Sequence, residues 1–180
     1  VAIARDLIGR ILLTTFDGIR TSGRIVETEA YNGVTDRASH AYNGRRTART
    51  SVMYLGGGVS YVYLCYGIHH LFNVVTNVEG IPHAVLIRAI EPLEGVETML
   101  ARLNKPALDH SVGRGPGIVS KALGISTAHT GLPFGDTIGL YSDGQVPGEI
   151  IASKRIGVDY AGPDANLPYR FHLQGNPFVS

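Results

Sequence analysis

The stretch SYVYLCYGIHHLFNVV, residues 60–75, contains two β-prone runs separated by one glycine. Residues 60–66 and residues 68–75 are rich in aromatic and β-branched side chains, the composition of strands. Gly67 supplies a residue that tolerates the tight turn between them. We therefore predict an antiparallel hairpin here, and the rest of the fold is interpreted around it.

Three tyrosines of this hairpin admit two interpretations. Strand alternation places Tyr61 and Tyr63 on one face and Tyr66 on the other, at the turn. In the simpler interpretation the rings pack the sheet, which we expect for at least one of them. In the alternative, one ring lines a pocket and another is a wedge, because aromatic rings stack on an extruded base and fill the gap it leaves in a duplex.

Further short strands, with few helices between them, follow the same pattern along the chain. Strands are predicted over residues 11–16, 24–30, 84–90, 137–141, 149–153 and 169–173. Helices are predicted over 4–10, over 93–103 with Glu91 and Pro92 at its start, and from the GRGPG motif at 113–117 to Leu123, with Gly124 as its stop. The regular strand–helix alternation of a doubly wound parallel sheet is missing. The pattern predicts a mixed α+β fold: one domain, residues 1–180, on a curved, mainly antiparallel, open-barrel-like sheet with packed helices and a protruding β-hairpin.

Composition narrows the class of protein. A chain of 180 residues with 44% apolar and 17% charged residues is that of a folded globular domain. No run approaches the roughly 18 apolar residues of a membrane span, and the start of the chain lacks the apolar core of a secretory signal. The chain starts at Val1 rather than Met, so we expect it to be trimmed. The single cysteine, Cys65, excludes an intramolecular disulfide; we expect a buried, inert thiol and a reducing compartment.

Positive charge is concentrated in one segment, although the net charge is only +1. The sequence DRASHAYNGRRTARTS, residues 36–51, contains Arg37, Arg45, Arg46 and Arg49 with a single acid. Such a patch is typical of a phosphate-binding surface, and equally of an ordinary solvated loop. Composition leaves both interpretations open.

Metal ligands are not indicated by the histidine pattern. His69 and His70 are neighbours in a predicted strand and so point to opposite faces, while His40 and His83 have no partner at ligand spacing. We therefore expect no metal site. The GRGPG motif precedes a helix whose free N–H groups could bind an anion, but a structural turn is at least as well supported.

Two glutamates in the segment ETEAYNGVTDRASH, residues 27–40, are candidates for catalysis. A period of two places Glu27, Glu29 and Tyr31 on one strand face. A carboxylate on a core-facing side is costly unless it is paired, hydrogen-bonded or protonated, so on a cleft wall one glutamate would suit a general base. On a solvent-facing side both would be ordinary charges. Parity does not say which glutamate would act.

Several motifs together carry a resemblance to a known family. They are ETEAY, His40, the loop from Arg45 to Met53, YVYLCYGIHHLFNVV, AVLIRAIEPLEG, RGPGIVSKALGI and LPYRFHLQGNPFVS. In this order, from the first residues to the last, they resemble the alkyladenine DNA glycosylases, also called 3-methyladenine DNA glycosylases of the mammalian type. The resemblance implies an enzyme that flips alkylated or deaminated purines out of duplex DNA, hydrolyses their N-glycosidic bonds and so initiates base excision repair.

The resemblance also implies roles for individual residues. Glu29 matches the general base that activates water, and Arg88 matches an arginine that helps to hold this water and a nearby phosphate. Tyr31, His40 and Tyr63 match the walls around the flipped base, Asn73 matches the asparagine that clashes with the amine of guanine, Tyr66 matches the intercalating ring, and Arg45 and Arg49 match residues near the DNA backbone. Glu27 is expected to be a supporting residue, paired with a buried arginine.

Two positions depart from the family's pattern: Tyr54 stands where Phe is usual and Thr50 where Asn is common. No lysine lies among the matched positions, so we expect a monofunctional hydrolase without lyase chemistry, cofactor or metal. The expected partner is double-stranded DNA with a damaged purine, bound by a monomer inside the cell, with the genomic DNA and without a membrane. A silent damage-binding module and a hydrolase of free nucleosides remain alternatives from other classes.

Overall fold

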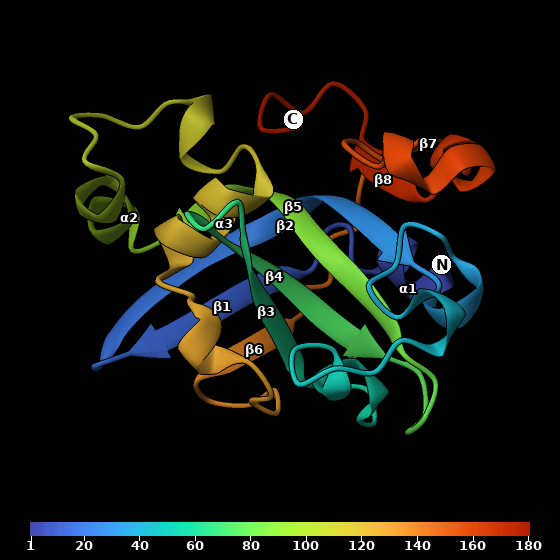
Figure 1. Ribbon diagram of the computed structural model, residues 1–180. Helices are drawn as coiled ribbons and strands as arrows, with labels where there is room; N and C mark the ends of the chain where they lie inside the picture. Colours follow the sequence, from blue (N-terminus) through green and yellow to red (C-terminus); the bar gives the residue numbers. More distant parts are fainter.

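The computed structural model describes residues 1–180 and is built around eight antiparallel strands that curl into a half-barrel (Figure 1). Six of them form a path in the order β3-β4-β5-β2-β1-β6. The strands are β1 (Ile11–Phe16), β2 (Ile19–Tyr31), β3 (Ser60–Cys65), β4 (His69–Thr76), β5 (His83–Glu94), β6 (Ile138–Tyr141), β7 (Ile150–Ser153) and β8 (Arg170–Leu173). The predicted fold class is confirmed.

Strand β2 is long enough to pair with two different strands along one edge. Its first half, residues 19–24, pairs with β1, and its second half, residues 27–29, pairs with β8. Strand β7 then adds to β8, so the C-terminal part of the chain reaches the strand that carries both glutamates. Residues almost 150 positions apart are brought together in this way: Glu27 pairs with His172.

Three α-helices accompany the sheet: α1 (Ala2–Asp6), α2 (Val96–Leu103) and α3 (Pro116–Leu123). Helices α2 and α3 lie together at one end of the sheet, whereas β7 and β8 lie at the other (Figure 1). The main core lies where the helices meet the sheet, and its fully buried members include Leu12, Ile25, Phe72, Ile87, Ile90, Met99 and Leu123. None of the helices has the length and apolar character of a membrane-spanning segment.

Most predicted elements are confirmed, and the helix predicted over residues 93–103 is wrong in its first part. Glu91 and Pro92 belong to β5, where they pair with Arg24 and Gly23, and helix α2 begins only at Val96. The spacing of apolar residues does not reveal this boundary, because the pairing with β2 extends the strand. The first helix is likewise shifted, to Ala2–Asp6 instead of residues 4–10.

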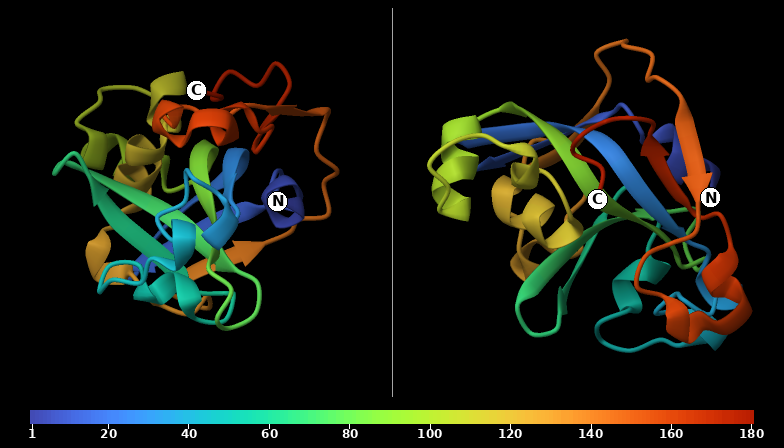
Figure 2. Two further views of the ribbon diagram at one scale, coloured as in Figure 1. Left: turned by 45° about the vertical axis from the view of Figure 1, so that its right-hand side comes forward. Right: turned by 90° about the horizontal axis from the view of Figure 1, so that it is seen from above.

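The predicted hairpin is formed by β3 and β4 and projects from the body of the molecule (Figure 2). Its turn is closed by a hydrogen bond from Ile68 N to the Cys65 carbonyl, 3.1 Å. Tyr66 and Gly67, the two central residues, have φ of 51° and 71°, as in the turns that match strand twist. A tyrosine rarely adopts a positive φ, so placing Tyr66 in this turn costs some backbone strain.

Candidate active site

Glu29 is fully buried, and its carboxylate has three polar contacts, which come from three different segments of the chain. Its Oε1 accepts a hydrogen bond from the Ile156 backbone N–H at 2.7 Å, and its Oε2 accepts one from the Tyr31 hydroxyl at 2.9 Å. The Arg88 guanidinium lies 3.5 Å from Oε1. Burial raises the pKa of Glu29 above its ordinary value, although Arg88 and the two hydrogen bonds oppose the shift. A carboxylate with a raised pKa at a cleft is suited to accept a proton.

Glu27 has a different environment, although it is equally buried. Its Oε1 accepts hydrogen bonds from Arg88 at 3.0 Å and Arg170 at 2.6 Å, and its Oε2 accepts both the N–H and the hydroxyl of Ser180. Burial alone would raise the pKa of Glu27, but the Ser180 and Arg170 hydrogen bonds and the Arg88 charge lower it overall. The expected pairing of Glu27 with a buried arginine is confirmed.

Arg88 reaches both glutamates because of irregular pairing between β2 and β5. Glu27 pairs with Ala89 and Thr28 pairs with Ile87, so Arg88 is an extra residue in its strand. A second irregularity at Val26 compensates on β2. Bulges of this kind redirect a side chain, and here the guanidinium lies between the two carboxylates. Sequence alternation alone would not place it there.

Above Glu29 the wall of the site is aromatic. The rings of His40 and Tyr63 meet edge to face with centroids 4.6 Å apart, and the His40 Nδ1 hydrogen-bonds the Tyr61 hydroxyl at 2.9 Å. The recess is lined by Tyr31, Ala38, His40, Met53, Tyr61, Tyr63, Asn73, Ala84 and Tyr160. All four residues expected to form the base pocket therefore lie together.

The protonation state of His40 and the orientation of the Asn73 amide set the polar character of the recess. Burial, followed by the charges of Arg49 and Arg45, lowers the pKa of His40 to about 4, so its ring is neutral at pH 7. The amide nitrogen of Asn73 donates to the carbonyls of Tyr61 and Leu71, at 3.1 and 3.3 Å. Because the amide nitrogen makes both hydrogen bonds, the amide oxygen is the polar atom of Asn73 that is available to a ligand in the recess.

A cleft of about 620 Å³ connects the aromatic recess to the hairpin tip. Tyr31, His40, Tyr63 and Tyr160 line both spaces, and the cleft adds Glu29, Arg88 and Tyr66. Its size lies in the range typical of ligand sites, with room for a purine nucleotide. The carboxylate, the aromatic walls and the projecting tyrosine thus belong to one continuous site.

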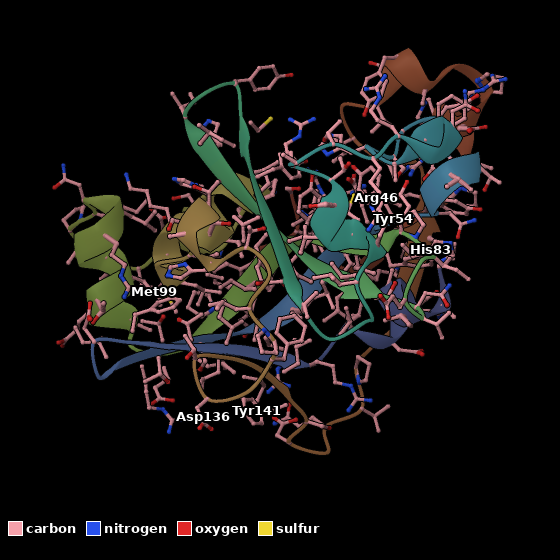
Figure 3. All side chains as sticks on the ribbon, turned by 60° about the horizontal axis from the view of Figure 1, so that its bottom comes forward. Arg46, Tyr54, His83, Met99, Asp136 and Tyr141 are labelled. Atoms are coloured by element: carbon pink, nitrogen blue, oxygen red, sulfur yellow. The ribbon has the colours of Figure 1, made fainter.

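The basic segment forms one rim of the cleft. Arg37 and Arg45 line it, and Arg49 lies close enough to lower the pKa of His40. The Arg46 guanidinium lies 4.9 Å from the centroid of the Tyr54 ring, beside the hairpin (Figure 3). None of these arginines has a carboxylate partner within ion-pair distance. Their guanidinium charges are therefore not neutralised by a carboxylate.

The two departures from the family's pattern have a shared role in this rim. The Tyr54 hydroxyl donates to the Arg45 carbonyl at 3.1 Å, and the Thr50 hydroxyl donates to the same carbonyl at 3.3 Å. Thr47 N donates to the Thr50 hydroxyl at 2.8 Å. These contacts hold the loop that carries Arg45.

At the hairpin tip the Tyr66 side chain is 91% exposed, so packing of the sheet does not explain it. Ile68, next to it, is also exposed. The neighbouring Cys65 was expected to be buried and is not: it is half-buried and lines the cleft, because it lies at the end of the projecting β3.

The segment from Arg155 to Tyr160 was missed by the sequence analysis. Ile156 donates to Glu29, Tyr160 lines the recess while its hydroxyl donates to the Ala38 carbonyl, and Arg155 lies 5.0 Å from the centroid of the Tyr31 ring. No local pattern marks these residues, since their partners lie more than 110 positions away in the chain. Arg170 and Ser180 lie in the last of the resemblance motifs, but their contacts with Glu27, 143 and 153 positions away, were not predicted.

The remaining motifs have structural explanations. In GRGPG, a β-carbon on Gly113 would lie 1.8 Å from the Ile90 carbonyl oxygen, and Ile90 N donates to the Gly113 carbonyl. The glycine therefore serves close packing of the loop against β5, which favours the structural turn. No group of three or more His, Cys, Asp or Glu side chains is arranged to hold a metal ion.

A buried carboxylate beneath an aromatic recess, with a basic rim and a projecting ring, fits the class of enzymes that cleave the bond to a flipped nucleobase. Comparison with known proteins places the chain among the DNA glycosylases. The family described as "Methylpurine-DNA glycosylase (MPG)" matches residues 1–177. The chain therefore belongs to the methylpurine-DNA glycosylase family, and it is an enzyme that hydrolyses N-glycosyl bonds.

Relatives with assigned names are similar along nearly their whole length. A protein of Chlamydia pneumoniae, named "Putative 3-methyladenine DNA glycosylase", is 50% identical over 177 residues, which cover 96% of this chain and 89% of the relative. Proteins with the same name from Desulfitobacterium hafniense and Bacillus cytotoxicus are 43% and 45% identical, and the alignments cover 99% of this chain.

Proposed function

We propose that this chain is a monofunctional DNA glycosylase that flips an alkylated or deaminated purine out of duplex DNA and hydrolyses its N-glycosidic bond. Water activated by Glu29 attacks C1′ of the damaged nucleotide, which initiates base excision repair. The observation that carries the proposal is the position of Glu29: it is fully buried, its pKa is raised, and it lies at the floor of the cleft below Tyr31, His40 and Tyr63.

One general base is enough for this reaction. A cationic or electron-poor purine is already a good leaving group, so the protein has to supply a positioned water and a proton acceptor. Arg88, 3.5 Å from Glu29, orients the carboxylate and adds positive charge where a phosphate approaches. A lysine nucleophile would be needed for lyase chemistry, and none lines the cleft.

The aromatic walls compensate for the cost of extruding the base. Flipping costs a few kcal/mol, least for a weakly paired lesion, and stacking returns about 1–3 kcal/mol per base. Tyr31, His40 and Tyr63 supply this stacking, with Tyr160 at the mouth. Tyr66 fills the gap in the duplex, and the Asn73 amide oxygen meets the base edge, where it excludes the amine of guanine by contact.

The proposal includes the partner and the form of the protein. Arg45 and Arg49 contact backbone phosphates, which carry no sequence information. The chain acts as one catalytic domain and as a monomer on double-stranded DNA with a damaged purine. It works inside the cell, where the genomic DNA is.

Base release from a panel of duplexes, each with one defined lesion, tests the proposal. We expect release of hypoxanthine or 3-methyladenine in a time course, and a strand that stays intact until the abasic site is cleaved by alkali. Binding of lesion DNA without release above buffer would identify a silent binding module instead. Cleavage of free nucleosides but not of duplexes would identify a nucleoside hydrolase.

A further inference from the structure

A second buried ion pair, between Arg155 and Asp36, lies next to the Tyr31 ring but lines neither the recess nor the cleft. Arg155 and Asp36 form a two-pronged contact, with Nη1 to Oδ2 at 2.6 Å and Nη2 to Oδ1 at 2.9 Å. Both side chains are almost completely buried. Desolvation offsets much of the attraction within such a pair, so stability alone does not explain its place beside the pocket.

The arginine connects the pair to the strand that carries Glu29. Its Nη1 also donates to the Ala30 carbonyl at 2.9 Å, and its Nη2 to the Asp164 carbonyl at 3.2 Å. All four terminal N–H groups therefore have acceptors. The guanidinium also lies 5.0 Å from the centroid of the Tyr31 ring. Arg155 thus contacts the residue between Glu29 and Tyr31 and the wall formed by Tyr31 itself.

The aspartate connects the pair to the segment that leads to His40. Its Oδ2 accepts the Asn32 N–H at 2.9 Å, and its Oδ1 accepts the Ala38 N–H at 3.0 Å. These contacts fix the chain between the end of β2 and the second pocket wall. Burial alone would raise the pKa of Asp36, but the hydrogen bonds from Arg155 and the main chain lower it overall, which favours the ionised carboxylate.

The residue after Arg155 donates directly to the catalytic carboxylate. Ile156 N lies 2.7 Å from Glu29 Oε1, so the position of this donor depends on where the Arg155 side chain is anchored. We propose that Asp36 and Arg155 are a positioning pair that fixes the Ile156 N–H against Glu29 and holds Tyr31 and the His40 segment in register with it. The inference rests on the proposed function of Glu29 as the general base.

Lysine is not a substitute for arginine at this position. It has no planar fork for the carboxylate and no flat face to lie against Tyr31. Because small misplacements at an active site cost up to about 100-fold in rate, we expect Arg155→Lys to lower the single-turnover rate by roughly 10- to 100-fold. Loss of the Ile156 hydrogen bond would also raise the pKa of Glu29 further, so the acid limb of the pH–rate profile should move to higher pH.

A more exposed ion pair that does not line the cleft provides the control, with side-chain exposures of 15% and 30%. Arg24 and Asp143 also form a two-pronged contact, with Nη2 to Oδ2 at 2.7 Å and Nη1 to Oδ1 at 3.3 Å. Neither residue lines the cleft. Arg24→Lys and Asp143→Asn should change thermal stability while the single-turnover rate and the acid limb stay as in the parent protein.

The experiment compares Arg155→Lys and Asp36→Asn with these controls in single turnover, at saturating enzyme, on the duplex lesion that the parent protein processes fastest. Slower release with a displaced acid limb in both pair variants, and in neither control, would support the inference. An unshifted limb with a rate loss no larger than the controls' would overturn it. Because Asp36→Asn also leaves the buried Arg155 without a charged partner, both pair variants are assayed at a temperature at which circular dichroism shows them to be folded. Absence of release by the parent protein would refute the proposed function itself.

Discussion

At the scale of single residues, two glutamates on one strand face have separate tasks. Glu29 has a raised pKa and lies at the cleft, whereas Glu27 has a lowered pKa and lies among four donors. The Arg88 guanidinium contacts both carboxylates, so its ion pair with Glu27 fixes its position beside Glu29. Parity could place both side chains on one face, but only the distant donors distinguish them.

Replacing Glu27 should affect stability more than chemistry. Glu27→Gln leaves Arg170 without a carboxylate partner and leaves Arg88 with Glu29 alone, at 3.5 Å, and breaking a buried pair costs roughly 3–5 kcal/mol. Because its folded pKa is lowered, ionised Glu27 contributes stability at pH above 4.5, and this contribution is lost as the pH falls through the folded value. Urea unfolding at pH 7 and at pH 4 measures both effects. A fully stable but inactive variant would mean that Glu27, not Glu29, is the base.

The pH dependence of base release should have one acid limb, set by Glu29. A general base must be ionised, so the rate falls as the pH drops through its pKa, which lies above the ordinary value of 4.5. His40 should add no limb near 6.5, because its pKa is about 4. Single-turnover rates from pH 4 to 9 check this. If His40→Gln removed a limb near neutral pH, the assignment to Glu29 would be wrong.

At the scale of elements, the hairpin was the most predictable part of the chain and α2 the least. Aromatic and β-branched runs around Gly67 define β3 and β4 without reference to any partner. The start of α2 depends instead on how far β5 stays paired with β2, a long-range effect that local spacing does not record. The bulge at Arg88, which builds the site, is invisible for the same reason.

The hairpin tip should contribute to flipping and little to folding. Tyr66→Ser removes an exposed ring worth about 1–3 kcal/mol of stacking, so we expect roughly 10-fold or greater loss of duplex activity. The folding free energy should stay nearly constant. Tyr141, a half-exposed tyrosine on β6 at the opposite end of the molecule from the tip, is a suitable control (Figure 3). Equal activity losses in Tyr66→Ser and Tyr141→Ser would rule out the wedge.

At the scale of the whole molecule, the site is assembled from segments that are far apart in sequence. β2 supplies the carboxylates, the loop after it supplies His40 and the arginines, the hairpin supplies Tyr63 and Tyr66, and residues 155–160 close the back. The family resemblance identified most contributors by position. Residues 155–160 carry no such pattern, because they contact Glu29, Tyr31 and Ala38, which only the fold brings close to them.

Positive charge is concentrated in the arginine segment although the net charge is small, so the salt dependence of DNA binding tests which arginines contact phosphates. The net charge is +1, yet Arg45 and Arg49 have no acidic partners. Each phosphate contact contributes about −0.9 to the slope of log K against log salt, so Arg45→Gln with Arg49→Gln should reduce the slope by about 1.8. Fluorescence anisotropy from 50 to 200 mM salt measures it. An unchanged slope would place the phosphates elsewhere.

The most direct test of the account is base release by Glu29→Gln beside the parent protein, on one lesion duplex, with binding measured in parallel. The substitution keeps the shape of the side chain and removes the proton acceptor at the floor of the cleft. The account predicts no release above buffer and lesion-DNA binding close to that of the parent protein. Release at the parent rate, or loss of both binding and the folded state, would contradict the assignment of Glu29 as the general base.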